Sequence, residues 1–181
     1  MLAIDVSGSM GEMLFSRTNA GIAATLSQAI RMVIEERPEF TFDVCLFANY
    51  AVLAKSPAIE DIITASHSTG RGRDNMQLAM QRLRYTPEYI HAYKNRNAIL
   101  GIALTDACFR PQTIKSARKQ IRESASREKW MAILAHGASK QDAATIFGTE
   151  TVDATADLTQ SIQSIAMAIQ STIERAELVR S

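Results

Sequence analysis

Short runs of apolar residues alternate with longer amphipathic segments along most of the chain. The most continuous run, AILGIALTD at 98–106, has the composition of a strand that is buried on both faces, as in a parallel sheet covered by helices. Further apolar runs predict strands at 1–6, 41–47, 51–54 and 130–135, and a short strand near 149–154.

Between these strands, apolar residues recur at spacings of three and four, which indicates helices with one buried face. A helix over 20–36 and a closing helix from residue 158 onwards show this pattern most clearly. Pro87 is placed near the first turn of a shorter helix, where its missing N–H is tolerated. The residues predicted to face inward are Ile22, Leu26, Ile30, Val33, Met76, Ala79, Met80, Leu83, Ile114, Ala117, Ile121, Leu158, Ile162, Ile165, Ile169 and Ile173.

The repeated strand–helix order predicts an α/β fold with a mostly parallel, doubly wound central sheet flanked by helices. The link at 48–50 has hairpin length, so the strand at 51–54 is expected to be an antiparallel edge strand. No linker or repeat divides the sequence, and we expect a single domain over residues 1–181.

Composition narrows the class of protein. Apolar residues make up 46% and charged residues 22%, as in a soluble globular protein, and a net charge of +1 argues against a chain built mainly to bind nucleic acid. No apolar run approaches the length of a membrane-spanning helix, and the N-terminal residues do not resemble a signal peptide. We therefore expect a cytoplasmic protein that does not bind membranes. Cys45 and Cys108 fit no metal-binding spacing and are expected to be buried free thiols.

Polar side chains follow two of the predicted strands at the point where each strand ends. Asp5, Ser7 and Ser9 form a D-x-S-x-S pattern after the first strand, and Asp106 ends the run at 98–106. Residues two apart in extended backbone face the same way, and right-handed crossovers would make the two strands neighbours. Two close carboxylates repel unless a cation lies between them, and carboxylate and hydroxyl oxygens suit Mg²⁺, or Mn²⁺ or Ca²⁺. The alternative is that these residues only cap and turn the chain.

With these residues in place, the chain resembles a von Willebrand factor A-type (VWA) domain, on the stretches DVSGSM and LTDA. The resemblance implies a metal-ion-dependent adhesion site with Asp5, Ser7 and Ser9 as ligands from the first loop. Asp106 would act from the fourth strand, directly or through water. Such a site commonly leaves one metal position open for a carboxylate of a partner protein. Ala107 stands where the family often has glycine.

The second loop departs from the family pattern. The stretch GRGRDN places Arg73 where the family usually has a threonine; Asp74 follows it, and Thr69 lies four residues earlier. Three alternatives are open: Thr69 reaches the site through a longer loop, Asp74 replaces the threonine, or the Arg73 guanidinium lies near the acids and competes with a cation. Arg71 and Arg73 are either part of a partner-binding loop or a solvated basic loop.

We expect a metal-dependent protein-interaction module without catalysis of its own, whose partner is another protein supplying an acidic residue. The alternative is a VWA subunit of an ATPase-associated or chelatase-like complex, with a ring-shaped ATPase as partner. A hydrolytic or phosphotransfer enzyme is disfavoured because no nucleophile, base or lysine accompanies the acids. No specific nucleic acid is expected as a partner.

Overall fold

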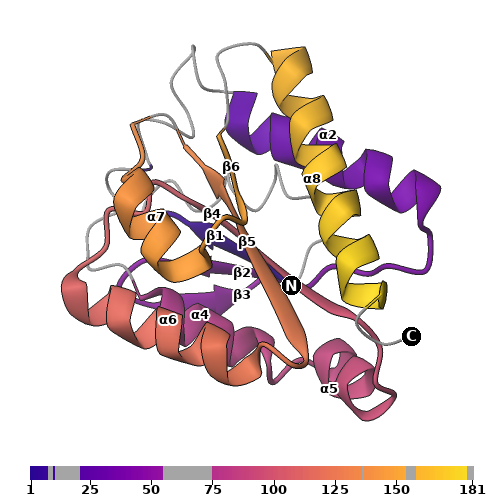
Figure 1. Cartoon of the computed structure of the whole chain (residues 1–181), viewed down its shortest axis with the longest axis horizontal. Helices are drawn as coiled ribbons and strands as arrows, with labels where there is room; N and C mark the ends of the chain where they lie inside the picture. Colours follow the sequence, from indigo (N-terminus) through magenta and orange to yellow (C-terminus); the bar gives the residue numbers. More distant parts are fainter. Residues whose placement is uncertain (8–9, 11–20, 55–74, 136, 154–157, 179–181) are drawn as a thin grey trace.

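The computed structural model describes residues 1–7, 10, 21–54, 75–135, 137–153 and 158–178. Figure 1 shows the layers: a central sheet, with α4, α6 and α7 over one face and α2 and α8 over the other. The strands are β1 (Leu2–Asp5), β2 (Val44–Phe47), β3 (Ala51–Leu53), β4 (Ile99–Thr105), β5 (Glu128–Leu134) and β6 (Thr151–Asp153). The helices are α2 (Gly21–Glu36), α4 (Met76–Leu83), α5 (Pro87–Lys94), α6 (Pro111–Ser124), α7 (Lys140–Phe147) and α8 (Leu158–Leu178).

The strands lie in the order β3-β2-β1-β4-β5-β6. All neighbouring pairs are parallel except β2 and β3, which run antiparallel at the edge. This confirms the predicted doubly wound α/β fold with one antiparallel edge strand. In the register of β1 and β4, Ile4 pairs with Leu104, so the ends of these two strands lie level. The strand order reverses between β1 and β4, which is where ligands bind in folds of this kind.

Alternate residues of each central strand supply the two halves of the core. Leu2, Ile4, Ile102 and Leu104 pack with α2 and α8, whereas Ala3 and Ala103 face α4, α6 and α7. Every residue of β4 is buried, as the continuous apolar run predicts. The inward residues Met76, Ala79, Met80 and Leu83 of α4 are fully buried, and so are Ile165 and Ile169 of α8.

Helix starts follow local chemistry. The side chain of Asn75 caps α4 by accepting a hydrogen bond from the Leu78 backbone N–H at 3.1 Å. Thr86 caps α5 in the same way, with Pro87 in the first turn.

The start of β5 differs from the sequence prediction: the strand begins at Glu128 rather than at Trp130. The sequence pattern misses this start because a glutamate rarely lies in a buried strand. Here its charge is satisfied by Arg84 and Tyr89 from outside the strand and by Trp130 within it.

Candidate functional site

Asp5 is fully buried at the carboxyl end of β1, and its carboxylate is held from two sides. Its Oδ1 accepts a hydrogen bond from the Ser7 backbone N–H at 2.9 Å. Its Oδ2 accepts one from the Thr105 hydroxyl, at the end of β4, at 2.7 Å. The first bond is local, and the second joins neighbouring strands, so the carboxylate is positioned by both the turn and the sheet.

Thr105 also organises the turn that follows β4. Its Oγ1 accepts a hydrogen bond from the Ala107 backbone N–H at 2.9 Å. Ala107 has a positive φ of 53°, in the left-handed region that a glycine adopts without strain. The hydrogen bond from Ala107 to Thr105 therefore helps to hold an alanine where the backbone conformation favours glycine.

Asp106 is the second buried acid at this edge, and it has no exposed surface. Its Oδ1 accepts a hydrogen bond from the Cys108 backbone N–H at 3.0 Å, and its carbonyl oxygen accepts one from the Ser139 N–H at 2.8 Å. Its Oδ2 is buried and has no hydrogen-bond partner among the described residues. A buried carboxylate oxygen without a partner is unfavourable, so this atom points to a missing ligand.

These residues fit a hard divalent cation. Two carboxylates and the buried Ser7 stand at the ends of neighbouring strands. The Asp106 oxygen that no described residue satisfies is the type of ligand that Mg²⁺ prefers. Within the described ranges no group of three or more His, Cys, Asp or Glu side chains could hold a metal ion. In this part of the chain, the acids available to such a cation are Asp5 and Asp106.

The structure brings together three of the residues predicted from the sequence: Asp5, Ser7 and Asp106. The other predicted residues, Ser9 of the first loop and Thr69, Arg71, Arg73 and Asp74 of the second loop, lie outside the described residues. The three alternatives for the second loop therefore stay predictions.

Two features differ from the sequence interpretation or were missed by it. Cys108 is exposed, not buried, so the expectation of two buried thiols is wrong for this residue and holds only for Cys45. Cys108 follows the apolar run, beyond the turn at Ala107, where the chain has left the sheet. The sequence interpretation also missed Thr105, although its place directly before Asp106 was a usable signal.

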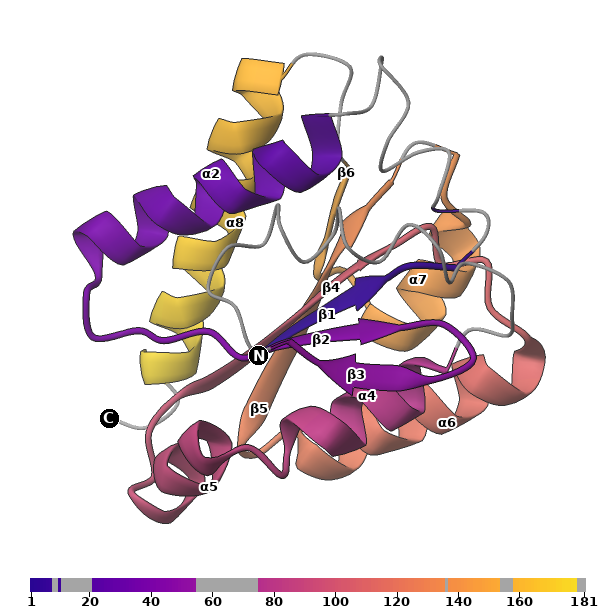
Figure 2. The ribbon, with the colours of Figure 1, turned by 180° about the vertical axis from the view of Figure 1, so that it is seen from behind.

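A cavity of about 900 Å³ lies away from this site, among residues at the amino end of the sheet. Its lining includes Asp43, Tyr89 and Ile99 and does not include Asp5, Ser7 or Asp106. Because the two acids stand at the opposite ends of the strands, the cavity and the acids are separate features. Figure 2 shows the direction of the strands, with the arrows of β1 and β2 pointing away from α5, which lies at the amino end.

No family model and no curated protein sequence matches the chain. Among solved structures, it is similar to proximal thread matrix protein 1 of the mussel byssus, with a TM-score of 0.60 and 14% identity over 95% of this chain. The chain spans 45% of that protein's length. It is also similar to a manganese-loaded TRAP protein of Plasmodium vivax, with a TM-score of 0.61 and 17% identity, covering 95% of this chain and 71% of that one.

A third similar structure is the VWA domain of SpRpn10, with a TM-score of 0.52 and 13% identity, covering 94% of this chain and 93% of that one. Together with the strand order and the antiparallel edge strand, these likenesses establish that the chain has a VWA-type α/β fold. In the part of the chain that the structure describes, no helix is both long and apolar enough to cross a membrane.

Proposed function

We propose that this chain is a protein-interaction module that holds a divalent cation at the carboxyl edge of its sheet and uses it to bind a carboxylate of a partner protein. The observation that carries the proposal is Oδ2 of Asp106, which is buried at the topological switch point and has no hydrogen-bond partner in the part of the chain that the structure describes. A cation would satisfy this oxygen and relieve the repulsion between Asp106 and Asp5. Mg²⁺ is the first candidate, and Mn²⁺ or Ca²⁺ could replace it.

The proposed ligands are Asp5, Ser7 and Asp106, with Ser9 added on the VWA resemblance. Such a set supplies few protein oxygens, and Mg²⁺ bound by few protein ligands keeps several waters that an incoming carboxylate can replace. The bound cation would supply a positive charge for the partner's acid. The similar TRAP structure is described as manganese-loaded, which supports divalent-cation binding on this fold.

The proposal assigns no reaction to the chain. The neighbouring residues hold the two acids in position. Thr105 and the Ser7 backbone orient Asp5, and the Cys108 N–H orients Asp106. Binding a partner's carboxylate through a cation held by these residues would require no nucleophile or general base.

The test is calorimetric titration with MgCl₂ and MnCl₂, combined with thermal melts in EDTA and in millimolar Mg²⁺. The purified chain should bind metal and melt at a higher temperature with it, because a ligand of the native state raises its stability. Asp106→Asn keeps the shape of the side chain and an oxygen for the Cys108 N–H, and should lose the metal response.

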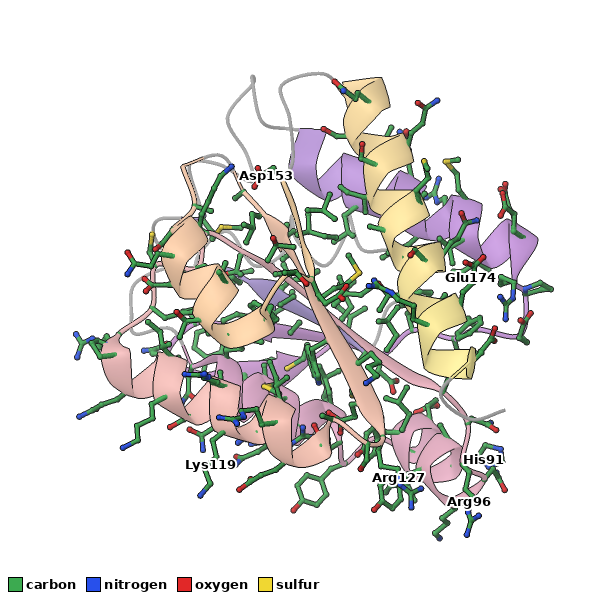
Figure 3. The ribbon with its side chains drawn as sticks, viewed as in Figure 1. His91, Arg96, Lys119, Arg127, Asp153 and Glu174 are labelled. Atoms are coloured by element: carbon green, nitrogen blue, oxygen red, sulfur yellow. The ribbon has the colours of Figure 1, made fainter. Side chains whose placement is uncertain are left out.

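The matched control is Asp153→Asn. Asp153, labelled in Figure 3, also ends a strand at this edge. It is half exposed and pairs with Lys140 at 2.6 Å. This variant should keep the full metal response. Equal responses of Asp106→Asn and the unmodified chain, or no metal binding by the unmodified chain, would contradict the proposal.

A further inference from the structure

Helix α6 carries a stripe of cations along its outer face. Lys115, Arg118, Lys119 and Arg122 recur at spacings of three and four residues, so they share one side of the helix, and all four are exposed. Figure 3 shows Lys119 on this side, pointing away from the sheet. We call these four residues the α6 stripe; with a rise of 1.5 Å per residue it is roughly 10 Å long.

The α6 stripe is poorly compensated by acids. Lys119 lies 3.7 Å from Glu123, which is the acidic residue of this helix. Lys115, Arg118 and Arg122 make no ion pair with any described residue. Like charges at these spacings disfavour a helix. Apart from the Lys119–Glu123 pair, the stripe makes no ion pair with the described residues that would stabilise the fold, which points to a role outside the fold.

Elsewhere in the described chain, several basic side chains are paired with acids. Arg37 contacts Glu177 at 2.5 Å, and Arg175 contacts Glu150 at 2.6 Å. Both arginines belong to the side of the sheet that α2 and α8 cover, where exposed glutamates are common. These glutamates are Glu35, Glu36, Glu174 and Glu177.

Charge is therefore separated across the sheet, although the net charge of the chain is only +1. Glu174 on α8 and Lys119 on α6 lie on opposite sides of the molecule (Figure 3). A protein with this distribution attracts an anionic partner to one face and repels it from the other. The α6 stripe therefore gives one side of the molecule a positively charged surface.

We propose that the α6 stripe is a docking surface for an acidic segment of a partner protein. The side chains stand on one convex helix, whereas proteins that follow a nucleic-acid backbone use a basic groove with aromatic side chains for stacking, and α6 has no aromatic residue. A lipid surface would favour large apolar side chains beside the cations. The large apolar side chains of α6, Ile114 and Ile121, instead turn inward against the core. Extended backbone advances about 3.3 Å per residue, so three or four residues of an acidic segment would span the stripe.

Binding at the α6 stripe does not require the cation site, so it is tested in EDTA, which removes divalent cations. A fluorescein-labelled oligo-glutamate peptide is titrated with the full chain, with anisotropy as the readout, at about 50 mM salt and again at several-fold higher salt, because screening weakens contacts between exposed charges. We expect binding at low salt that weakens as salt rises. Arg118→Glu with Arg122→Glu should weaken it by about tenfold, the loss expected for two reversed exposed charges.

The matched control is Arg31→Glu, which reverses an exposed arginine on α2, across the sheet, and should leave peptide affinity within about twofold. It is compared with the single variant Arg118→Glu, so that the two chains carry the same net charge. Circular dichroism checks folding, and Arg118→Gln with Arg122→Gln replaces the charge reversals if these unfold.

The proposal is overturned if the unmodified chain does not bind the peptide at low salt, or if Arg31→Glu and Arg118→Glu weaken binding equally. It is also overturned if a DNA duplex, or vesicles of phosphatidylserine and phosphatidylcholine, bind the chain more tightly than the peptide does. Loss confined to the α6 variants, with weaker binding of duplex and vesicles, supports it.

Discussion

The Thr105 hydroxyl donates a hydrogen bond of 2.7 Å to Oδ2 of Asp5 across 100 positions of sequence. The same oxygen of Thr105 accepts the Ala107 N–H at 2.9 Å, and Ala107 lies next to Asp106. One side chain therefore orients the first acid and the turn that carries the second. This relationship makes Thr105 a positioning residue for the proposed cation site.

Thr105→Val keeps the shape of the side chain but removes its hydroxyl. It should lower the free energy of unfolding by about 1–3 kcal/mol, because Asp5 Oδ2 loses a buried donor and the Ala107 N–H loses its acceptor. Urea denaturation in EDTA measures the loss. The variant should also bind Mg²⁺ more weakly than the unmodified chain. Thr105→Ser is the control, since it restores the hydroxyl and should restore most of both properties; equal effects of valine and serine would argue against positioning.

Gly101 lies under the indole ring of Trp130 on the neighbouring strand. A Cβ added at Gly101 would overlap the Trp130 ring, which is only 4% exposed and has little room to move. Gly101→Ala should therefore lower the free energy of unfolding by about 1–3 kcal/mol, as overpacking of a core does. In a double-mutant cycle with Trp130→Phe, the smaller ring should reduce the loss. Additive losses would show that the two residues do not interact.

Glu128 is a buried carboxylate that four side chains satisfy. Arg84 donates to both oxygens at 2.7 Å, the Tyr89 hydroxyl donates at 2.7 Å, and the Trp130 indole N–H donates at 2.8 Å. The Ser124 hydroxyl is the fourth partner and donates at 3.0 Å. Glu128→Gln should lower the free energy of unfolding by about 3 kcal/mol, because the partly buried Arg84 loses its anion.

Chemical denaturation at neutral pH measures this loss. Glu123→Gln on the exposed side of α6 is the matched control and should change stability by less than about 0.5 kcal/mol. A comparable loss in both variants would contradict a special role for the Glu128 network.

The same network predicts that the free energy of unfolding falls at acidic pH. Burial alone would raise the pKa of Glu128, but hydrogen bonds from Arg84 and Trp130 and the charge of Arg84 outweigh it, so its pKa lies below the ordinary 4.5. The unfolded chain takes up the proton first as pH falls, so this stabilisation is complete above pH 4.5 and is lost as pH falls through the lowered folded pKa. Denaturation curves should show the gap between the unmodified chain and Glu128→Gln narrowing below that pH. A gap that widens in acid would contradict the assignment.

The two thiols should differ in reactivity. Cys108 is exposed, whereas burial raises the pKa of the Cys45 thiol to about 12. Since the thiolate is the reactive form, the native chain should react rapidly at Cys108 and very slowly at Cys45. A colorimetric thiol assay should count one fast thiol in buffer and two in urea. Cys108→Ser should abolish the fast phase, and rapid reaction of that variant in buffer would place Cys45 at the surface.

Much of the fold could be predicted from the sequence because burial leaves a local periodic pattern. The continuous apolar run of β4, the buried face of α4 and the spacing in α8 each follow from residues a few positions apart. The pairing of β1 with β4 also followed, because right-handed crossovers restrict the order of parallel strands. The same reasoning placed Asp5 and Asp106 at one edge of the sheet.

Local patterns and topology rules were thus enough to predict the α/β class, the pairing of the two central strands, and the position of Asp5 and Asp106 at the carboxyl edge. The folded chain was needed to show that Thr105 holds Asp5, that Oδ2 of Asp106 is left without a partner among the described residues, and that Glu128 lies buried in a strand. The physical reason is the sequence separation of the residues that interact. Hydrophobic periodicity is written in neighbouring residues, whereas a hydrogen bond between side chains far apart in sequence depends on strand register and on where each turn leaves the sheet, which no local pattern records.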